Sequence, residues 1–407
     1  MKIKSIYVNN FKSLVDFKID LADFNCLVGL NGSGKSTFLQ FVSFLSQLMK
    51  GDMKHWFDEH NWDMIQTPLD KIKTLKFRVE FISHDNLNGK IKEGYWEAIF
   101  HHLICFEECF HFDNYTLQVE SDYKDRNRTF EDIDNDQRIF GYYTLTKNNE
   151  KVIDNERIRF KYQGSILSSL NEPEVNKIFD SVRKFVISIR SFDLLIPFML
   201  RQPSISPVDS IGNSGEFFAS YYDQIGEEER SHILAKLKNI FPQIDTIKVN
   251  SFDYSGKTKI LSFVEKFSDK LEFVSYHAND GILRLIAFLS QLESDSSFLL
   301  FDEIENGINQ EIIEFLLDQL ISSDKQIVVT THSPLFLNYL EDDLARKTVQ
   351  YFYKTPEGFT RCIPFFSIPS VNEKLKMLGP GEIIADTNLT HFNMEIRQYQ
   401  STTPINS

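Results

Sequence analysis

Three glycines, a lysine and a serine stand close together near the start of the chain. Residues 29–36 read GLNGSGKS, which has the GxxxxGKS spacing of a phosphate-binding loop. Glycines let the backbone fold tightly around a phosphate, where a Cβ would obstruct, and the N–H groups of the loop favour an anion. Lys35 would reach the β- and γ-phosphates of ATP, and Ser36 would offer its hydroxyl to Mg²⁺. The predicted ATP-binding residues are Gly29, Asn31, Gly32, Ser33, Gly34, Lys35, Ser36 and Thr37.

Two acidic residues close a short apolar segment in the second half of the chain. Residues 298–301 read FLLF and are followed by Asp302 and Glu303. In P-loop enzymes a buried strand beside the phosphate strand delivers an aspartate to the magnesium ion, and a following glutamate can activate the attacking water. Such a pair could also close an ordinary strand, but the phosphate loop upstream favours a metal role for Asp302 and a catalytic role for Glu303.

A histidine follows the next apolar segment. Residues 326–330 read QIVVT and lead into Thr331, His332 and Ser333. A histidine at the carboxyl end of a strand lies on the ligand side of a doubly wound sheet. A lone histidine is usually structural. Because one helical crossover separates this histidine from the strand that ends at Asp302, we predict that His332 belongs to the site.

The elements expected around the glycines are a strand, a loop and a helix. Residues 24–28 form an apolar run typical of a buried strand, and residues 37–48 carry apolar side chains at helical spacing. Two short strands are expected before them, at 2–8 and 14–21. This order predicts an α/β fold of the P-loop NTPase class, with a mixed central sheet flanked by helices.

Three segments are predicted along the chain. Residues 1–84 form the N-terminal part of an ATPase domain, 85–184 an inserted antiparallel β-subdomain with a small helical lobe, and 185–407 the C-terminal part of the ATPase domain. In the insertion we predict strands at 95–104, 115–119, 141–145 and 157–162, a loop at 122–138 and a helix near 166–182. Further strands are expected at 77–82, 185–189, 244–249, 259–264, 271–274, 349–353 and 360–365, and helices at 215–222 and 227–241. Residues 278–284 are expected to open an apolar helix that runs to about 292.

Histidines and cysteines gather in the predicted insertion, at His101, His102, Cys105, Cys109 and His111. Zinc binds such side chains, but their spacing matches no common zinc pattern. Neighbouring histidines on a strand also point to opposite faces. We therefore interpret the set as core cysteines and edge histidines, and four cysteines in 407 residues as no disulfide framework.

The composition favours a folded, cytoplasmic protein. Hydrophobic residues make up 42% of the 407, enough for one or two domains. The sequence contains no apolar run of about 18 residues or more, so that no membrane span is predicted. Its N-terminus lacks the apolar core of a signal peptide. The formal net charge of −14 gives no global attraction to nucleic acid, so that DNA contact would require a local basic patch.

The phosphate loop, the segment Asn279-Asp280-Gly281, the acidic pair and the histidine resemble, in this order, the ABC-type ATPases of the RecF, SMC and OLD group. The opening IKSIYVNNFKSLVDFKIDL is also similar to this group. The resemblance covers residues 1–50 and about 185–340. It implies that two ATPase heads sandwich ATP and Mg²⁺ in a homodimer or higher homo-oligomer, with the phosphate loop of one head facing the signature motif of the other.

The resemblance also assigns roles by position. Asp302 would support Mg²⁺ together with Ser36, Glu303 would be the catalytic base, and His332 would sense the γ-phosphate. The loop at 305–307 would run along the dimer interface, and Lys12 would approach the phosphates.

The signature motif of this group has a serine where this chain has Asn279, followed by Asp280 and Gly281. Asparagine can still donate a hydrogen bond to a phosphate of the other head. The substitution predicts slow or regulated ATP turnover. Gln66 is the candidate for the magnesium-sensing glutamine of the group.

More narrowly, the chain resembles the compact ATPases of bacterial anti-phage systems such as Septu. The segments that carry this resemblance are SIRSF (188–192), FPQID (241–245) and LGPGEIIAD (378–386). The resemblance implies an ATPase that regulates a partner effector encoded nearby, a nuclease or another effector, with any nucleic acid bound through the complex. The candidate docking surfaces are 85–184 and 367–385.

Three other functions were weighed against this one. A RecF-like or SMC-like ATPase could act directly on DNA in repair or maintenance, although the acidic composition counts against it. A self-contained nuclease would require a second carboxylate cluster, and about 70 residues after His332 are short for one. A transporter ATPase would require the missing signature serine and a different N-terminal pattern.

Overall fold

The computed structural model describes residues 1–51, 53, 56, 74–84, 91–101, 104–121, 141–147, 150–151, 156–157, 162–170, 177–193, 195–253, 256–267 and 270–402. The chain divides into two compact units. The first unit contains Met1–Asp23, Gly29–Ile189 and Gln350–Pro364. The second contains Phe24–Val28, Arg190–Val349 and Phe365–Ser407. The predicted loop at 122–138 and Gln66 lie outside the described residues.

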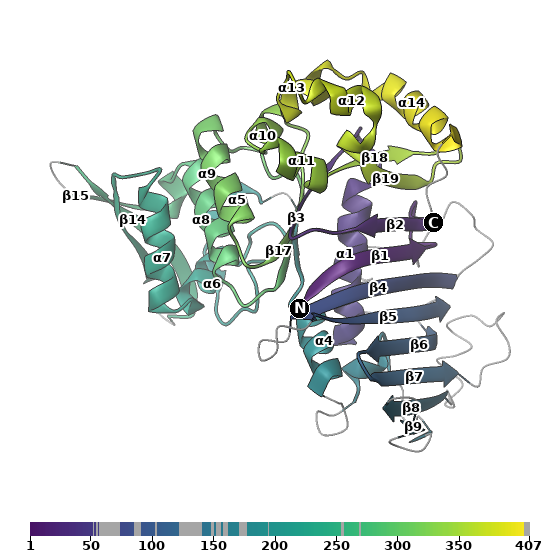
Figure 1. Cartoon of the computed structure of the whole chain (residues 1–407). Helices are drawn as coiled ribbons and strands as arrows, with labels where there is room; N and C mark the ends of the chain where they lie inside the picture. The colour runs from purple at the N-terminus through teal and green to yellow at the C-terminus, as the bar shows by residue number, and fades with distance from the viewer. Residues whose placement is uncertain are drawn as a thin grey trace. The chain divides into compact units, whose positions relative to one another are not determined.

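A large antiparallel sheet forms most of the first unit (Figure 1). Its strands run in the order β10-β8-β7-β6-β5-β4-β1-β2, with β9 paired to β8. They are β1 (Lys2–Asn9), β2 (Phe17–Asp20), β4 (Thr74–His84), β5 (Ile91–His101), β6 (Ile104–Phe112), β7 (Tyr115–Ser121), β8 (Gly141–Lys147), β9 (Glu150–Lys151) and β10 (Glu156–Arg157). The predicted antiparallel β-subdomain is therefore confirmed. Its strand β5, in the predicted insertion, pairs with β4 of the predicted segment 1–84 along its whole length, and the boundary at residue 85 stays a prediction.

Alternation along the strands turns one face of this sheet toward a helix. Phe77 on β4 is fully buried and packs edge-to-face on Trp96, with ring centroids 4.8 Å apart. Phe77 also contacts Phe41 of α1 (Lys35–Lys50), 5.9 Å away. This aromatic core fixes α1, whose first residue follows the glycine loop, against the sheet.

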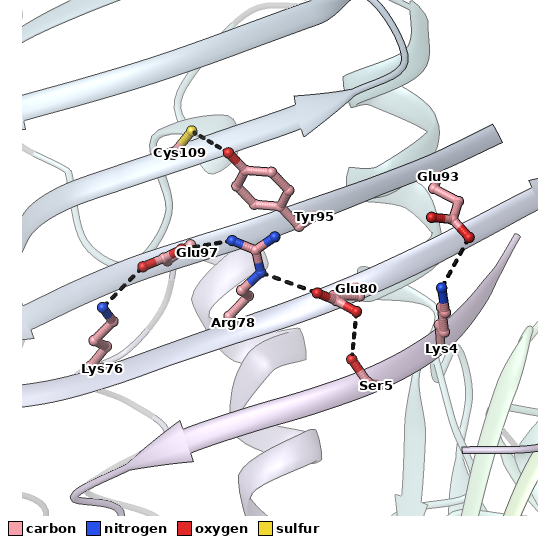
Figure 2. Close-up of polar contacts among 9 residues, drawn as sticks. All are labelled: Lys4, Ser5, Lys76, Arg78, Glu80, Glu93, Tyr95, Glu97 and Cys109. Atoms are coloured by element: carbon pink, nitrogen blue, oxygen red, sulfur yellow. Dashed lines mark hydrogen bonds and ion pairs between the residues drawn. The ribbon is translucent and has the colours of Figure 1, made fainter. Parts of the chain in front are cut away.

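The opposite face of the sheet carries paired charges (Figure 2). Arg78 lies 3.8 Å above the ring of Tyr95 and forms ion pairs with Glu80 and Glu97. Two more pairs join Lys76 to Glu97 and Lys4 to Glu93. Exposed pairs of this kind contribute about 0–1 kcal/mol each. Three cations face three carboxylates among these residues, so that the cluster has no excess positive charge for nucleic acid.

One carboxylate lies on the buried face. Glu108 on β6 is 1% exposed, and its oxygens accept hydrogen bonds from Trp96 Nε1 and from the Ile166 N–H, each at 2.8 Å. Burial raises the pKa of Glu108 from 4.5 to about 7, although these hydrogen bonds oppose the change. Glu108 thereby fastens the segment at 166 to the sheet.

The raised pKa of Glu108 predicts a stability that falls with pH. Because folding favours the protonated form, the stabilisation is complete below about pH 4.5, and about 3 kcal/mol is lost as the pH rises through 7. Urea unfolding of the wild type at pH 5 and pH 8, compared with Glu108→Gln, isolates this contribution. The variant should lack that part of the pH dependence, and exposed Glu107→Gln should retain it. Equal pH dependence in the wild type and Glu108→Gln would contradict the assignment.

A parallel sheet lies at the centre of the second unit. Its strands are β11 (Arg190–Phe192), β16 (Phe298–Phe301), β17 (Gln326–Thr330) and β3 (Phe24–Val28), in that order, and every adjacent pair is parallel. All residues of β3, β16 and β17 are buried, as their apolar runs predicted. The predicted α/β fold is confirmed. One detail differs, because β17 lies between β3 and β16, so that the strand ending at Asp302 is not the direct neighbour of the phosphate strand.

The second unit also contains a second sheet and ten α-helices among the described residues. A four-stranded sheet is formed by β12 (Ser204–Ile205), β13 (Ile244–Ser251), β14 (Thr258–Lys266) and β15 (Lys270–Val274). The helices are α5 (Pro197–Leu200), α6 (Phe218–Gln224), α7 (Glu227–Lys238), α8 (Asp280–Leu292), α9 (Gln310–Ile321), α10 (Pro334–Asn338), α11 (Asp342–Thr348), α12 (Pro369–Lys374), α13 (Pro380–Asp386) and α14 (Leu389–Thr402). No helix in the described part of the chain is long and apolar enough to cross a membrane.

Two predicted elements are corrected. The strand expected at 185–189 is instead the end of α4 (Lys177–Ile187), followed by the short strand β11. The buried residues Phe179, Val182 and Val186 recur at helical spacing, which the apolar run of 185–189 concealed. The helix expected near 166–182 is divided into the 3-10 turn η1 (Ile166–Ser168) and α4.

Candidate nucleotide-binding site

The glycine loop begins immediately after β3 and belongs to the first unit. Gly29, Gly32 and Gly34 have φ angles of 146°, 74° and 109°, which favour glycine. A Cβ on Gly29 would lie 2.2 Å from the carbonyl oxygen of Phe352, and one on Gly34 would lie 2.2 Å from Thr360 Oγ1. Two of the three glycines are thus also required by a neighbouring segment that packs against the loop.

Lys35, the first residue of α1, is 5% exposed. Its ammonium donates to the carbonyl oxygens of Gly29 at 2.9 Å and Leu30 at 3.3 Å. The loop carbonyls, rather than solvent, therefore accept the hydrogen bonds of the Lys35 ammonium. The ammonium already lies within the loop that would bind the phosphates.

The other predicted loop residues surround this lysine. Asn31 and Ser36 are exposed and Thr37 is half-buried, while Ser33 is buried. Within the described part of the chain, Ser33 Oγ has no hydrogen-bond partner. The positive end of the α1 dipole and a buried hydroxyl suit an anion here.

Lys12 lies in the turn between β1 and β2, with a φ of 50°. Its ammonium donates to Gln40 Oε1 of α1 at 2.9 Å, and burial lowers the pKa of Lys12 to about 8. The structure therefore places Lys12 against the side of α1. Its predicted approach to the phosphates stays a prediction.

The acidic pair lies in the second unit, at the carboxyl edge of the parallel sheet. Thr330, the last residue of β17, donates its hydroxyl to Asp302 Oδ1 at 2.5 Å and accepts the Glu303 N–H at 2.8 Å. Its carbonyl oxygen accepts the Ile304 N–H at 3.1 Å. One threonine thus connects the strand that leads to His332 with the Asp302 carboxylate and with the backbone of Glu303. The sequence showed Thr330 only as a strand residue.

Glu303 has a left-handed backbone, with a φ of 48°. This conformation is uncommon for a residue with a side chain and costs about 1 kcal/mol or more, and it recurs at functional sites. The Glu303 side chain is exposed, and Asn306 Nδ2 lies 3.4 Å from Glu303 Oε2. The hydrogen bond to Thr330 keeps the backbone in this conformation.

Glu305 connects the same loop with the histidine. Its Oε1 accepts the His332 N–H at 2.7 Å, and its Oε2 is buried with no hydrogen-bond partner among the described residues. The His332 side chain is exposed. The backbone position of His332 therefore depends on a carboxylate from the loop after Glu303, a second contact that the sequence did not reveal.

The predicted signature residues begin α8. Asn279 is the N-cap, and its Oδ1 accepts the Gly281 N–H at 2.7 Å. Asp280 is exposed and forms an ion pair with Arg201, which also donates to the Ala278 carbonyl oxygen at 2.8 Å. Gly281 is buried, so that only two of the three residues are exposed to a partner. The helix cap uses the side-chain oxygen of Asn279, so that its NH₂ group is the part of the side chain that can donate a hydrogen bond to a ligand.

The described members of the histidine and cysteine set of the first unit form no metal-binding cluster. Cys105 is buried, Cys109 Sγ lies 3.9 Å from the Tyr95 hydroxyl, and His111 Nδ1 lies 2.9 Å from Thr116 Oγ1. No group of three or more metal-binding side chains occurs within the described ranges. The side chain of His101 and all of His102 lie outside the described residues.

The fold and these loops define a P-loop ATPase. A family model for the AAA ATPase domain matches residues 1–337, and the chain belongs to this family. Asp302, Glu303 and His332 lie within the matched range. No curated protein matches the sequence.

Several solved structures are similar to the chain. An SMC head domain from Thermotoga maritima is 12% identical, with 89% of this chain and 99% of that chain covered and a TM-score of 0.43. An SMC head bound to the C-winged helix domain of ScpA is 14% identical, with 89% and 97% covered and a TM-score of 0.46. An SMC head domain with an extended coiled coil, bound to the C-terminal domain of ScpA derived from Pyrococcus furiosus, is 11% identical, with 92% and 99% covered and a TM-score of 0.45.

Proposed function

We propose that the chain is an ABC-type ATPase that hydrolyses ATP and regulates a partner effector. The proposed hydrolysis of ATP rests on the contacts of Thr330, at the end of the strand that leads to His332. Its hydroxyl donates to the Asp302 carboxylate and accepts the backbone N–H of Glu303. An aspartate carboxylate and a glutamate backbone fixed in this way at a sheet edge suit a metal-assisted phosphoryl transfer. The glycine loop, with Lys35 at its centre, supplies the phosphate-binding part.

The residues fit ATP and Mg²⁺ by their chemistry. Ser36 and Asp302 offer hydroxyl and carboxylate oxygens, which Mg²⁺ prefers, and the loop N–H groups and Lys35 offer donors to the phosphates. When bound, Mg²⁺ neutralises phosphate charge. Glu303 is the base that accepts a proton from water while the water oxygen attacks the γ-phosphorus. The bond from that phosphorus to the β–γ bridging oxygen breaks, which gives ADP and inorganic phosphate.

Two copies of the chain are proposed to share each nucleotide. Asn279 and Asp280 are exposed at the start of α8, where the helix dipole favours an anion. The Asn279 NH₂ group is the donor proposed to contact the γ-phosphate of the other copy. The Asn279 side chain is already fixed by its bond to the Gly281 N–H and offers only its NH₂ group to the γ-phosphate. We therefore expect slow hydrolysis of ATP.

The effector role rests on the resemblance to anti-phage ATPases, and an exposed apolar pair before α13 supports a docking surface there. The segment LGPGEIIAD begins at Leu378 and contains α13, where Asn338 Oδ1 accepts the N–H groups of Gly381 and Glu382 at 2.9 and 3.1 Å. Met377 and Leu378 just before it are 86% and 37% exposed. The exposed side chains of Met377 and Leu378, next to a helix end that Asn338 holds in place, suit the docking of a partner nuclease.

The effector role is tested with supercoiled plasmid, ATP, Mg²⁺ and the protein encoded next to this chain. We expect cleavage only when both proteins are present, with a rate that depends on ATP. The double variant Met377→Asp with Leu378→Asp should lower that rate about tenfold or more, which corresponds to about 1.4 kcal/mol of docking energy. Met394→Asp, which changes another methionine that is 51% exposed, is the matched control. Cleavage by this chain alone would contradict the proposal, and ATP-dependent binding of the plasmid by this chain alone would favour direct action on DNA.

A further inference from the structure

A C-terminal hairpin lies against the glycine loop of the first unit. It consists of β18 (Val349–Lys354) and β19 (Thr360–Pro364), which pair antiparallel. The Phe352 carbonyl approaches Gly29 so closely that no Cβ fits, and the Thr360 side chain does the same at Gly34. The hairpin lies outside residues 1–337, which the family model covers. Its contact with the loop is therefore not part of the matched domain.

Thr360 is the centre of this contact. Its side chain is completely buried, and its hydroxyl donates to the Ser33 carbonyl oxygen at 3.0 Å. The Thr360 hydroxyl oxygen also accepts a hydrogen bond from the Lys354 ammonium at 3.0 Å, and it lies 2.8 Å from the Ser13 hydroxyl. A hydroxyl has one proton to donate and two lone pairs to accept, so that all of its hydrogen-bonding capacity is used here. The acceptor at Ser33 belongs to the peptide whose N–H is that of Gly34.

The hairpin also fixes the turn that carries Lys12. The Thr360 N–H donates to the Ser13 carbonyl oxygen at 2.8 Å, and Arg361 Nη1 donates to the Val15 carbonyl oxygen at 2.6 Å. The Phe352 ring anchors the hairpin in the core, because its centroid lies 5.6 Å from that of Phe17 and 6.0 Å from that of Phe38.

We propose that Thr360 is a positioning residue for the phosphate loop, and that the hairpin β18–β19 is a brace for it. By donating to the Ser33 carbonyl oxygen, Thr360 fixes the orientation of the peptide between Ser33 and Gly34. The Gly34 N–H of this peptide is thereby directed toward the phosphates of ATP. A loop held in its binding conformation before ATP arrives loses less entropy when it binds. The inference rests on the proposed ATP binding by residues 29–36.

The test compares ATP binding by four proteins in titration calorimetry, with unfolding temperature as a check on the fold. Thr360→Val retains the shape and removes the hydroxyl, and should weaken ATP binding about tenfold. Thr360→Ser retains the hydroxyl and should bind within about threefold of the wild type. Thr355→Val is the matched control, because Thr355 lies in the same hairpin and its hydroxyl, among the described residues, accepts only the nearby Phe359 N–H, at 3.3 Å. Its ATP affinity should not change.

Turnover separates positioning from general destabilisation. We expect Thr360→Val to raise KM for ATP about tenfold while kcat changes less than about threefold, because the catalytic base is untouched. If Thr360→Val does not fold, Ser13→Ala removes one partner of the Thr360 hydroxyl, and its KM for ATP decides, with an increase of about threefold expected. Unchanged KM in the folded variants, with normal ATP binding by the wild type, would overturn the brace alone. No ATP binding by the wild type would overturn the proposed function itself.

Discussion

Replacing Glu303 with glutamine is expected to reduce ATP hydrolysis by about 100-fold or more while ATP still binds. A general base contributes about 10² to 10⁴ to the rate, and glutamine retains the size of the side chain but cannot accept the proton of water. The Glu303 N–H remains bonded to Thr330, so that the left-handed backbone of the loop should persist. The measurement is release of inorganic phosphate at saturating ATP and Mg²⁺.

The control for this variant is Glu314→Gln, which removes a carboxylate from the exposed side of α9. It should hydrolyse ATP at the wild-type rate. Calorimetry of Glu303→Gln should give an ATP affinity within about threefold of the wild type. Hydrolysis by Glu303→Gln at the wild-type rate would show that another group is the base.

Replacing Lys35 with methionine is expected to weaken ATP binding about 100-fold, or about 3 kcal/mol. Methionine fills nearly the same volume at this buried position, whereas alanine would also leave a cavity. The variant loses the charge that meets the phosphates. It also leaves the carbonyl oxygens of Gly29 and Leu30 without the ammonium, so that a small loss of stability is expected as well.

Titration calorimetry with ATP and Mg²⁺ measures this effect. Lys18→Met, which removes an exposed lysine from β2, is the control for the change in net charge. Its ATP affinity should equal that of the wild type. An unchanged affinity in folded Lys35→Met would disprove the assignment of residues 29–36 as the phosphate loop.

The residues whose chemistry is local could be predicted from the sequence. Gly29, Gly34 and Lys35 form a spacing that few other structures use, and the strand and helix on either side confirm the context. Asp302 and His332 were predicted as site residues because an apolar run ends shortly before each of them, and these runs form the buried parallel strands β16 and β17.

The residues that act through distant contacts could not be predicted. The Thr330 hydroxyl bonds to the backbone N–H of Glu303 and to the side chain of Asp302, 27 and 28 residues away, and the Thr360 hydroxyl bonds to the Ser33 carbonyl oxygen across 327 residues. A threonine in a strand gives no sign of such partners, because strand propensity alone explains its presence. The sequence contained one indirect sign of this contact, the glycines at 29 and 34. A Cβ at Gly34 would collide with the Thr360 side chain, but the glycine alone does not say which residue excludes it.

The strand β6 was missed for a different reason. Its central residues Glu107 and Glu108 interrupt the apolar alternation, and the sequence does not show that one of these carboxylates is buried and hydrogen-bonded. The helix α4 was partly assigned as a strand because its last apolar residues run together at 185–187. In both segments the tertiary partners decide the structure, and short windows of sequence do not contain them.

The most direct test of the proposed two-headed ATPase is sedimentation velocity of Glu303→Gln with Mg²⁺ and either ATP or ADP. Unhydrolysed ATP should hold two copies together, so that a dimer is expected with ATP and a smaller fraction of dimer with ADP. Adding Asn279→Asp retains a good helix cap but replaces the donor amide by a carboxylate that repels phosphate, and this should abolish the ATP-dependent dimer. Asn279→Ser, which also caps the helix and can donate, should preserve it. The same sedimentation coefficient with ATP and ADP, or an ATP-dependent dimer that Asn279→Asp does not weaken, would contradict the arrangement.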